Sequence, residues 1–266
     1  MEQSPYWVKQ TGKPLYPELE WSRPEHKLQA GKLLVIGGNQ FGFVEPSEAF
    51  KAAEQAGVGT ARLILPDSLR KYTGRTFSAG ELAPTTPSGS FSLQALAMFL
   101  DNALWADAVL VAGGIGRNSE TTILLETFLE KYQGRVTLTK DAADLMCAQP
   151  IAVLHRPDTL LVVAMGQLRE LGSGAHFPRA FTAEMGLVQL AENLHEFTKR
   201  FGLAIITKHQ GHYIVARGGQ VSTTPVTDEQ PVWRVTTAAK ATVWWLQNPT
   251  KPFEALTTAA YAASQP

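Results

Sequence analysis

Residues 106–117 read ADAVLVAGGIGR and combine a short apolar run with a cluster of glycines. A run of small and β-branched residues that ends in glycines is typical of a buried parallel strand that turns directly into a helix. The same pattern occurs upstream, where residues 32–39 read KLLVIGGN. We therefore expect two parallel strands whose carboxyl ends carry glycine loops.

The segments around these two strands alternate between strand and helix patterns. Further strands are predicted at residues 60–66, 135–139, 158–166 and 203–208, and helices at residues 47–57, 93–104, 119–132 and 181–201. HYIVARGGQVSTTP, residues 212–225, predicts a hairpin with Gly218-Gly219 at its turn, and the last forty residues predict helix, loop, helix. This alternation predicts an α/β fold with a doubly wound, mainly parallel central sheet and helices on both faces.

Two local details of this pattern can be tested directly. Ser47 is a candidate N-cap for the helix that ends at Gly57, because its hydroxyl can accept a backbone N–H bond. Residues 73–92 are rich in Gly, Pro, Ser and Thr and predict an irregular loop.

The first thirty residues differ from the rest of the chain. Four prolines oppose regular structure there, and four aromatic side chains can attach the segment to a surface: Pro5, Pro14, Pro17 and Pro24, with Tyr6, Trp7, Tyr16 and Trp21. We expect residues 1–30 to form an extended N-terminal arm and residues 31–266 to form a single α/β domain. Packing of the arm on its own domain and packing on a neighbouring subunit both remain open.

Composition argues against several classes of protein. Lys plus Arg and Asp plus Glu both number 24, so the formal net charge is zero and gives no case for nucleic acid or an anionic membrane as a partner. The one cysteine, Cys147, excludes an intramolecular disulfide and argues against a cysteine-based zinc site. The polar start of the chain lacks the apolar core of a secretory signal, and no apolar run is long enough to span a bilayer, so we expect a cytoplasmic protein.

The glycines after the two strands are the candidate ligand site. In doubly wound sheets, ligands bind beyond the carboxyl ends of the strands, and glycine lets backbone N–H groups approach an anion closely. The residues concerned are Gly37, Gly38 and Asn39 in the first loop and Gly113, Gly114, Gly116 and Arg117 in the second. A purely structural role, in which glycine only permits the turn, stays open beside nucleotide binding.

Four segments in series resemble the NAD(P)H-hydrate dehydratases of the ribokinase-like superfamily. They are VIGGN, ADAVLVAGGIGR, VTLTKDAADLMCA and RFGLAIITKHQGHYIV, and the resemblance extends from about Gly31 to Tyr261. It implies a ribokinase-like fold and an ATP- or ADP-dependent lyase, with Mg²⁺, that removes water from hydrated NADH or NADPH. It also implies a homo-oligomer.

The resemblance assigns several residues to the family's motifs. Gly113–Arg117 occupy the place of a Gly-Pro-Gly-Leu-Gly-Arg loop that helps to hold the dinucleotide, with Gly114 at the proline. Lys208–His212 match a Lys-Gly-Ala-Gly-Thr loop of the nucleotide site and keep Lys208 and Gly211. Residues 139–143 match an Asp-Ala-Asp-Ala-Leu segment, of which Asp141 alone keeps its aspartate.

Two other motifs are overwritten. Residues 164–167 replace a His-Pro-Gly-Glu segment, and Thr236, Thr237 and Lys240 fall in a stretch that replaces a Gly-Gly-Ser-Gly-Asp anion hole and its aspartate base. No Gly-x-Gly-Asp occurs in the last fifty residues. A general base contributes roughly 10²–10⁴ in rate and an oxyanion donor about 10²–10³, so we expect lost or altered catalysis.

Other roles for individual residues remain open. Asp141 and Asp144 can hold Mg²⁺ or accept a proton, and Lys240 can bind a phosphate or lie on the surface. His209 and His212 suggest a metal pair but more often belong to a polar loop, and Trp244 and Trp245 suit a core or an oligomer interface. Three hypotheses follow: a repurposed nucleotide- or dinucleotide-binding protein, an active dehydratase or small-molecule kinase, and a structural paralogue that pairs with an active partner.

Overall fold

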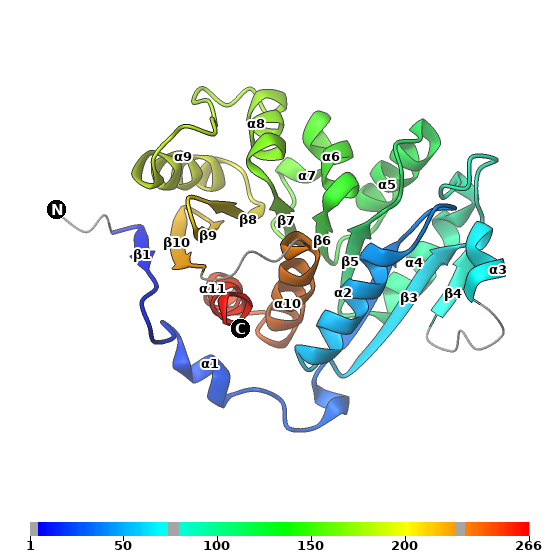
Figure 1. Cartoon of the computed structure of the whole chain (residues 1–266), viewed down its shortest axis with the longest axis horizontal. Coiled ribbons are helices and arrows are strands. Elements are labelled where there is room, and N and C mark those ends of the chain that lie inside the picture. Colours follow the sequence, from blue (N-terminus) through cyan, green and yellow to red (C-terminus); the bar gives the residue numbers. More distant parts are fainter. Residues whose placement is uncertain (1–4, 74–79, 227–231, 266) are drawn as a thin grey trace.

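The computed structural model describes residues 5–73, 80–226 and 232–265. The described strands form one ten-stranded sheet in the order β1-β10-β9-β8-β7-β6-β5-β2-β3-β4 (Figure 1). Their bounds are β1 Trp7–Lys9, β2 Lys32–Gly37, β3 Thr60–Pro66, β4 Gly80–Ala83, β5 Ala108–Gly113, β6 Arg135–Thr139, β7 Thr159–Val163, β8 Ala204–His209, β9 His212–Arg217 and β10 Gln220–Pro225. Within this sheet β9 is antiparallel to both neighbours and the other pairs are parallel, as the sequence predicted.

Helices cover both faces of the sheet (Figure 1). One face is covered by α4 Leu96–Trp105, α5 Ser119–Lys131, α6 Lys140–Ala148, α7 Ile151–Leu154, α8 Met165–Gly174 and α9 Leu187–Arg200. The other is covered by α2 Val44–Gln55, α10 Trp233–Gln247 and α11 Pro252–Ser264. The short helices are α1 Pro17–Trp21 and α3 Arg70–Thr73, with 3₁₀ turns at Lys27–Gln29, Asp67–Leu69 and Leu93–Ala95.

Two apolar cores, one on each face, explain this layering. Alternate side chains of a strand point to opposite faces. In β2, Leu34 and Ile36 enter one core, whereas Leu33 and Val35 enter the other. All four are fully buried, as expected of a strand covered on both sides.

The order of the strands creates a switch point between β2 and β5. From β2 the chain proceeds through β3 to β4 at one edge, and then from β5 through β6 and β7 to β8 in the other direction. The crossovers therefore diverge at the carboxyl ends of β2 and β5, where doubly wound sheets place their ligands. The two glycine loops identified in the sequence follow these two strands.

Three local predictions were wrong. Ser47 does not cap α2: the helix begins at Val44, and Pro46 lies in its first turn, where its missing N–H has no intrahelical role. α9 begins at Leu187 rather than at residue 181, because Gly186 precedes it in an extended conformation. The stretch from 73 to 92 is not loop throughout, since residues 80–83 pair with β3 as β4, while residues 74–79 lie outside the described residues.

The N-terminal arm packs on its own chain. β1 pairs in parallel with β10, and α1 lies below α11 (Figure 1). The backbone N–H of Val221 donates to the Tyr6 carbonyl at 2.8 Å, and the Trp7 indole donates to the Thr223 hydroxyl at 3.2 Å. Within the described residues, no helix is both long and apolar enough to cross a membrane.

Candidate functional site

Several helices begin at the carboxyl edge of the sheet. α2 follows β2, α5 follows β5, α6 follows β6 and α8 follows β7, each after a short connection or none. The start of α10 joins them, because its residue Arg234 contacts the first turn of α8. Helix N-termini carry partial positive charge and unpaired N–H groups, so this edge favours an anionic ligand.

The two glycine loops are hydrogen-bonded to each other. The Gly38 N–H donates to the Gly113 carbonyl at 3.1 Å, and the Asn39 amide donates to the Gly114 carbonyl at 2.6 Å. In the second loop, Gly113, Gly114 and Gly116 have φ values of 94°, 70° and 80°, a region that other residues rarely adopt. The loops predicted from the sequence thus contact each other directly at the switch point.

Asp141 lies against the second loop. Its Oδ2 accepts the Gly116 N–H at 2.8 Å, while its buried Oδ1 has no hydrogen-bond partner among the described residues. Burial raises the pKa of this carboxyl, and the N–H groups of Gly116, Ile115 and Gly114 partly oppose that rise because they favour the ionised form. A proton on Oδ1 would satisfy this buried oxygen.

Lys140 and Glu45 extend the site toward α2. Lys140 is the first residue after β6 and has φ of 56°. Its Nζ lies 3.9 Å from Glu45 Oε1, and the Glu45 carboxylate also lies beside Gly114. The sequence analysis did not identify Glu45 as a site residue. The one feature that could have indicated it is its position shortly after the first glycine loop.

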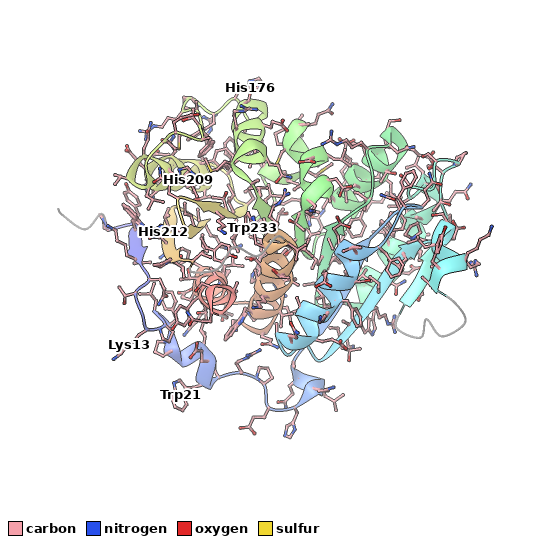
Figure 2. The ribbon with its side chains drawn as sticks, viewed as in Figure 1. Lys13, Trp21, His176, His209, His212 and Trp233 are labelled. Atoms are coloured by element: carbon pink, nitrogen blue, oxygen red, sulfur yellow. The ribbon has the colours of Figure 1, made fainter. Side chains whose placement is uncertain are left out.

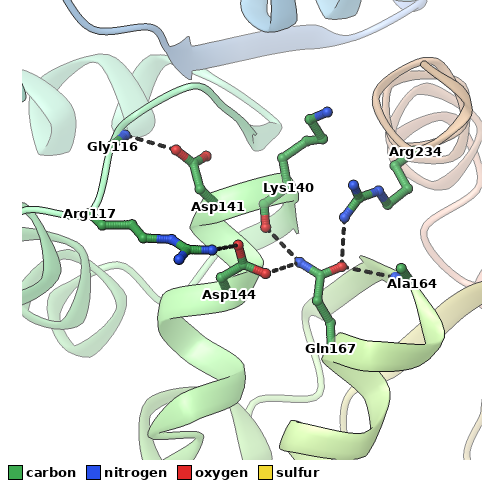
Figure 3. A network of polar contacts seen from close by, with 8 residues as sticks. All are labelled: Gly116, Arg117, Lys140, Asp141, Asp144, Ala164, Gln167 and Arg234. Atoms are coloured by element: carbon green, nitrogen blue, oxygen red, sulfur yellow. Dashed lines mark hydrogen bonds and ion pairs between the residues drawn. The ribbon is translucent and has the colours of Figure 1, made fainter. Parts of the chain in front are cut away.

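Gln167 links three helices, α6, α8 and α10, at the same edge (Figure 3). Its amide nitrogen donates to the Lys140 carbonyl at 2.7 Å and to Asp144 Oδ1 at 2.6 Å. Its amide oxygen accepts from the Ala164 N–H at 2.9 Å and from Arg234 Nη1 at 2.8 Å. Asp144 also pairs with Arg117 at 3.3 Å, so the network connects the second glycine loop to α6, α8 and α10.

A cleft of about 660 Å³ opens on this network. A volume of this size falls within the range of small-molecule sites. Its lining combines two arginines with two acids and polar amides: Arg117, Thr122, Asp144, Leu145, Ala148, Gln149, Ala164, Gly166, Gln167, Glu170 and Arg234.

The matches to the family's nucleotide loop lie elsewhere on this edge. Lys208 is in β8, and Gly211 lies in the turn to β9 with φ of 71°. His209 is buried, and its Nε2 is 2.7 Å from the Met185 carbonyl (Figure 2). None of the described contacts joins this turn to the glycine loops.

The residues at the family's anion hole are inside α10. The Thr236 N–H donates to the Val232 carbonyl, and Thr237 is fully buried. Lys240 is directed to α11, where its Nζ donates to the Ala262 carbonyl at 3.3 Å, and burial lowers its pKa. Trp244 and Trp245 are buried in the core, which bears out the packing interpretation of these residues.

Comparison with known proteins places this geometry in context. No protein-family model matches the chain. The bifunctional NAD(P)H-hydrate repair enzyme of Methanothermobacter thermautotrophicus is 29% identical over 124 residues, which are 46% of this chain and 24% of that enzyme. The matched part thus spans about a quarter of the length of the curated relative.

Solved structures match over nearly the whole chain. A ribokinase-like superfamily protein from Enterococcus faecalis superposes with a TM-score of 0.75 and 15% identity, covering 98% of this chain and 87% of that one. The ADP/ATP-dependent NAD(P)H-hydrate dehydratase from Bacillus subtilis, co-crystallised with ATP and Mg²⁺, superposes with a TM-score of 0.65 and 14% identity, covering 96% of this chain and 88% of that one. The phosphomethylpyrimidine kinase of Clostridium difficile superposes with a TM-score of 0.53 and 11% identity, covering 87% of this chain and 98% of that one.

Proposed function

The chain has a ribokinase-like α/β fold and is similar to NAD(P)H-hydrate dehydratases, and on that basis we propose that it binds a nucleotide or dinucleotide at the switch point with lost or altered catalysis. The observation that carries the proposal is the pair of interlocked glycine loops beside the cleft. The Gly38 and Gly116 N–H groups are bonded within the protein, to the Gly113 carbonyl and to Asp141, so the loops shape the site, and Arg117 at the end of the second loop brings positive charge to the cleft. The cleft next to them has room for the rest of such a ligand.

Altered catalysis is supported by the residues at two motif positions. Thr236 and Thr237 belong to α10 instead of a glycine loop, and Lys240 contacts the Ala262 carbonyl. Gln167, at the place of the family's glutamate, is a neutral amide that cannot transfer a proton as a carboxylate does.

The alternative, an active dehydratase or kinase, is favoured by Asp141. Its unpartnered Oδ1 is buried and fits a proton acceptor. The same carboxylate would serve as one ligand of Mg²⁺ only where that oxygen becomes accessible, since nucleotide-bound Mg²⁺ often uses only one or two protein carboxylates. Asp144 is bonded on both oxygens, which makes it the weaker candidate. Bound Mg²⁺ would supply charge neutralisation on the phosphates.

Ligand-dependent thermal unfolding tests the proposal. We expect ATP, ADP, NADH or NADPH, with or without Mg²⁺, to raise the Tm by roughly 5–10 °C at about a hundred times the dissociation constant. Gly114→Ala should reduce this shift, because the loop needs φ of 70° and a Cβ there would lie 3.1 Å from Glu45 Oε2.

Gly218→Ala is the matched control for Gly114→Ala. It imposes a similar backbone strain, at φ of 57°, in the β9–β10 turn, where no atom lies near the added carbon. A ligand-induced rise in Tm that is seen in wild type and in Gly218→Ala but is smaller in Gly114→Ala supports the proposal. Absence of any shift in wild type would reject it, and turnover of hydrated NADPH would favour the active alternative.

A further inference from the structure

Arg234 is a cation that no described carboxylate neutralises. It is the second residue of α10 and lines the cleft. Its one described hydrogen bond runs from Nη1 to the neutral amide oxygen of Gln167. A guanidinium has five N–H donors, so most of them remain available for a ligand.

Lys140 is a second incompletely paired cation. The 3.9 Å between its Nζ and Glu45 exceeds hydrogen-bond length, and its side chain is 27% exposed. A φ of 56° is uncommon for lysine, and such strained residues cluster at functional sites. Gly113 makes room for this conformation, since a Cβ there would lie 2.5 Å from Lys140 Cβ.

Gln167 holds these two residues near each other. Its amide contacts the Lys140 carbonyl with one atom and Arg234 with the other. In Figure 3 both cationic side chains lie in the space between α6 and α10. Gln167 itself is buried, and its bonds to the Ala164 N–H and Asp144 keep the amide in one orientation.

We propose that Lys140 and Arg234 bind the phosphate groups of a nucleoside diphosphate or triphosphate, and that Gln167 positions them. This inference rests on the proposed function and names the groups that recognise the phosphates. Both cations stand beside helix N-termini, where an anion is already favoured. The Thr236 N–H, at the position of the family's anion hole, donates to the Val232 carbonyl and is not free to bind an anion. Side-chain cations supply charge-assisted bonds in its place.

Isothermal titration of three variants tests this assignment. Lys140→Met and Arg234→Met remove the charge and keep most of the side-chain length. Lys131→Met is the control, because Lys131 is an exposed lysine at the end of α5, which begins at the carboxyl edge of the sheet and runs to the opposite one. The probes are ADP, adenosine and inorganic pyrophosphate, and unfolding without ligand confirms that each variant folds.

We expect Lys140→Met and Arg234→Met each to raise the dissociation constants of ADP and pyrophosphate by about 10- to 100-fold and to change that of adenosine by no more than about twofold. Lys131→Met should change the dissociation constant of every probe by no more than about twofold. Tight ADP binding that neither substitution changes would overturn the phosphate assignment and leave the proposed function standing. If pyrophosphate binds and either substitution weakens it, but ADP does not bind, Lys140 and Arg234 still bind phosphate, and the claim that the ligand is a nucleoside diphosphate or triphosphate is rejected. If wild type binds no probe, the phosphate assignment fails, and the proposed function then stands only on a Tm shift with NADH or NADPH.

Discussion

Gly113 shows how one residue sets the geometry of the site. It ends β5 with φ of 94°, and its missing side chain leaves space for Lys140, which follows the adjacent strand β6. Lys140 in turn adopts a left-handed conformation and is followed directly by Asp141, whose carboxylate accepts the Gly116 N–H. A glycine is therefore needed at this position both for its own turn and for the space that Lys140, after the adjacent strand, occupies.

Gly113→Ala should destabilise the protein by about 2–4 kcal/mol, because it adds backbone strain to a clash with Lys140 Cβ. Gly218→Ala, which adds strain in open space, should cost only about 1–2 kcal/mol. Urea unfolding of the two variants measures the difference. Equal losses would show that Lys140 does not constrain this position.

At the scale of elements, the first turn of α8 joins α6 and α10 through a single amide. Gln167 is 6% exposed and uses both amide atoms twice. These hydrogen bonds connect helices on opposite faces of the sheet, since α8 and α6 cover one face and α10 covers the other. The polar network thus contributes to holding the helix starts together at the carboxyl edge.

Gln167→Leu should lower the free energy of unfolding by about 2–3 kcal/mol, because it leaves the Ala164 N–H and Asp144 Oδ1 without their partner. For a chain of this length the Tm should fall by roughly 5–10 °C. Gln149→Leu, in the same cleft but exposed, should shift the Tm far less. Similar shifts in the two variants would mean that the network adds little stability.

At the scale of the whole molecule, the arm completes one edge of the sheet. β1 covers β10, which would otherwise present unpaired backbone groups to solvent. Tyr6 adds a ring stacked on His195 of α9, with centroids 3.9 Å apart. The first element of the chain is thus held against segments that follow it by about two hundred residues.

Deletion of residues 1–10 should lower the Tm and promote self-association, because the β10 edge can then pair with another strand. Light scattering across a range of protein concentrations measures the association. Trp21→Ala is the control, since that side chain is 88% exposed and its loss should change neither property (Figure 2). A truncated chain whose mass and Tm match wild type would contradict this account.

The sequence by itself determined the layered α/β fold and the edge where its glycine loops meet. Buried β-runs that end in glycine define parallel strands, and the carboxyl ends of parallel strands necessarily share one edge. Only the tertiary structure decided which side chains complete the site. Gln167 and Arg234 meet across 67 residues, and Lys240 is directed to α11. Such contacts depend on where each helix begins and on its rotation against its neighbours, which local patterns leave undetermined.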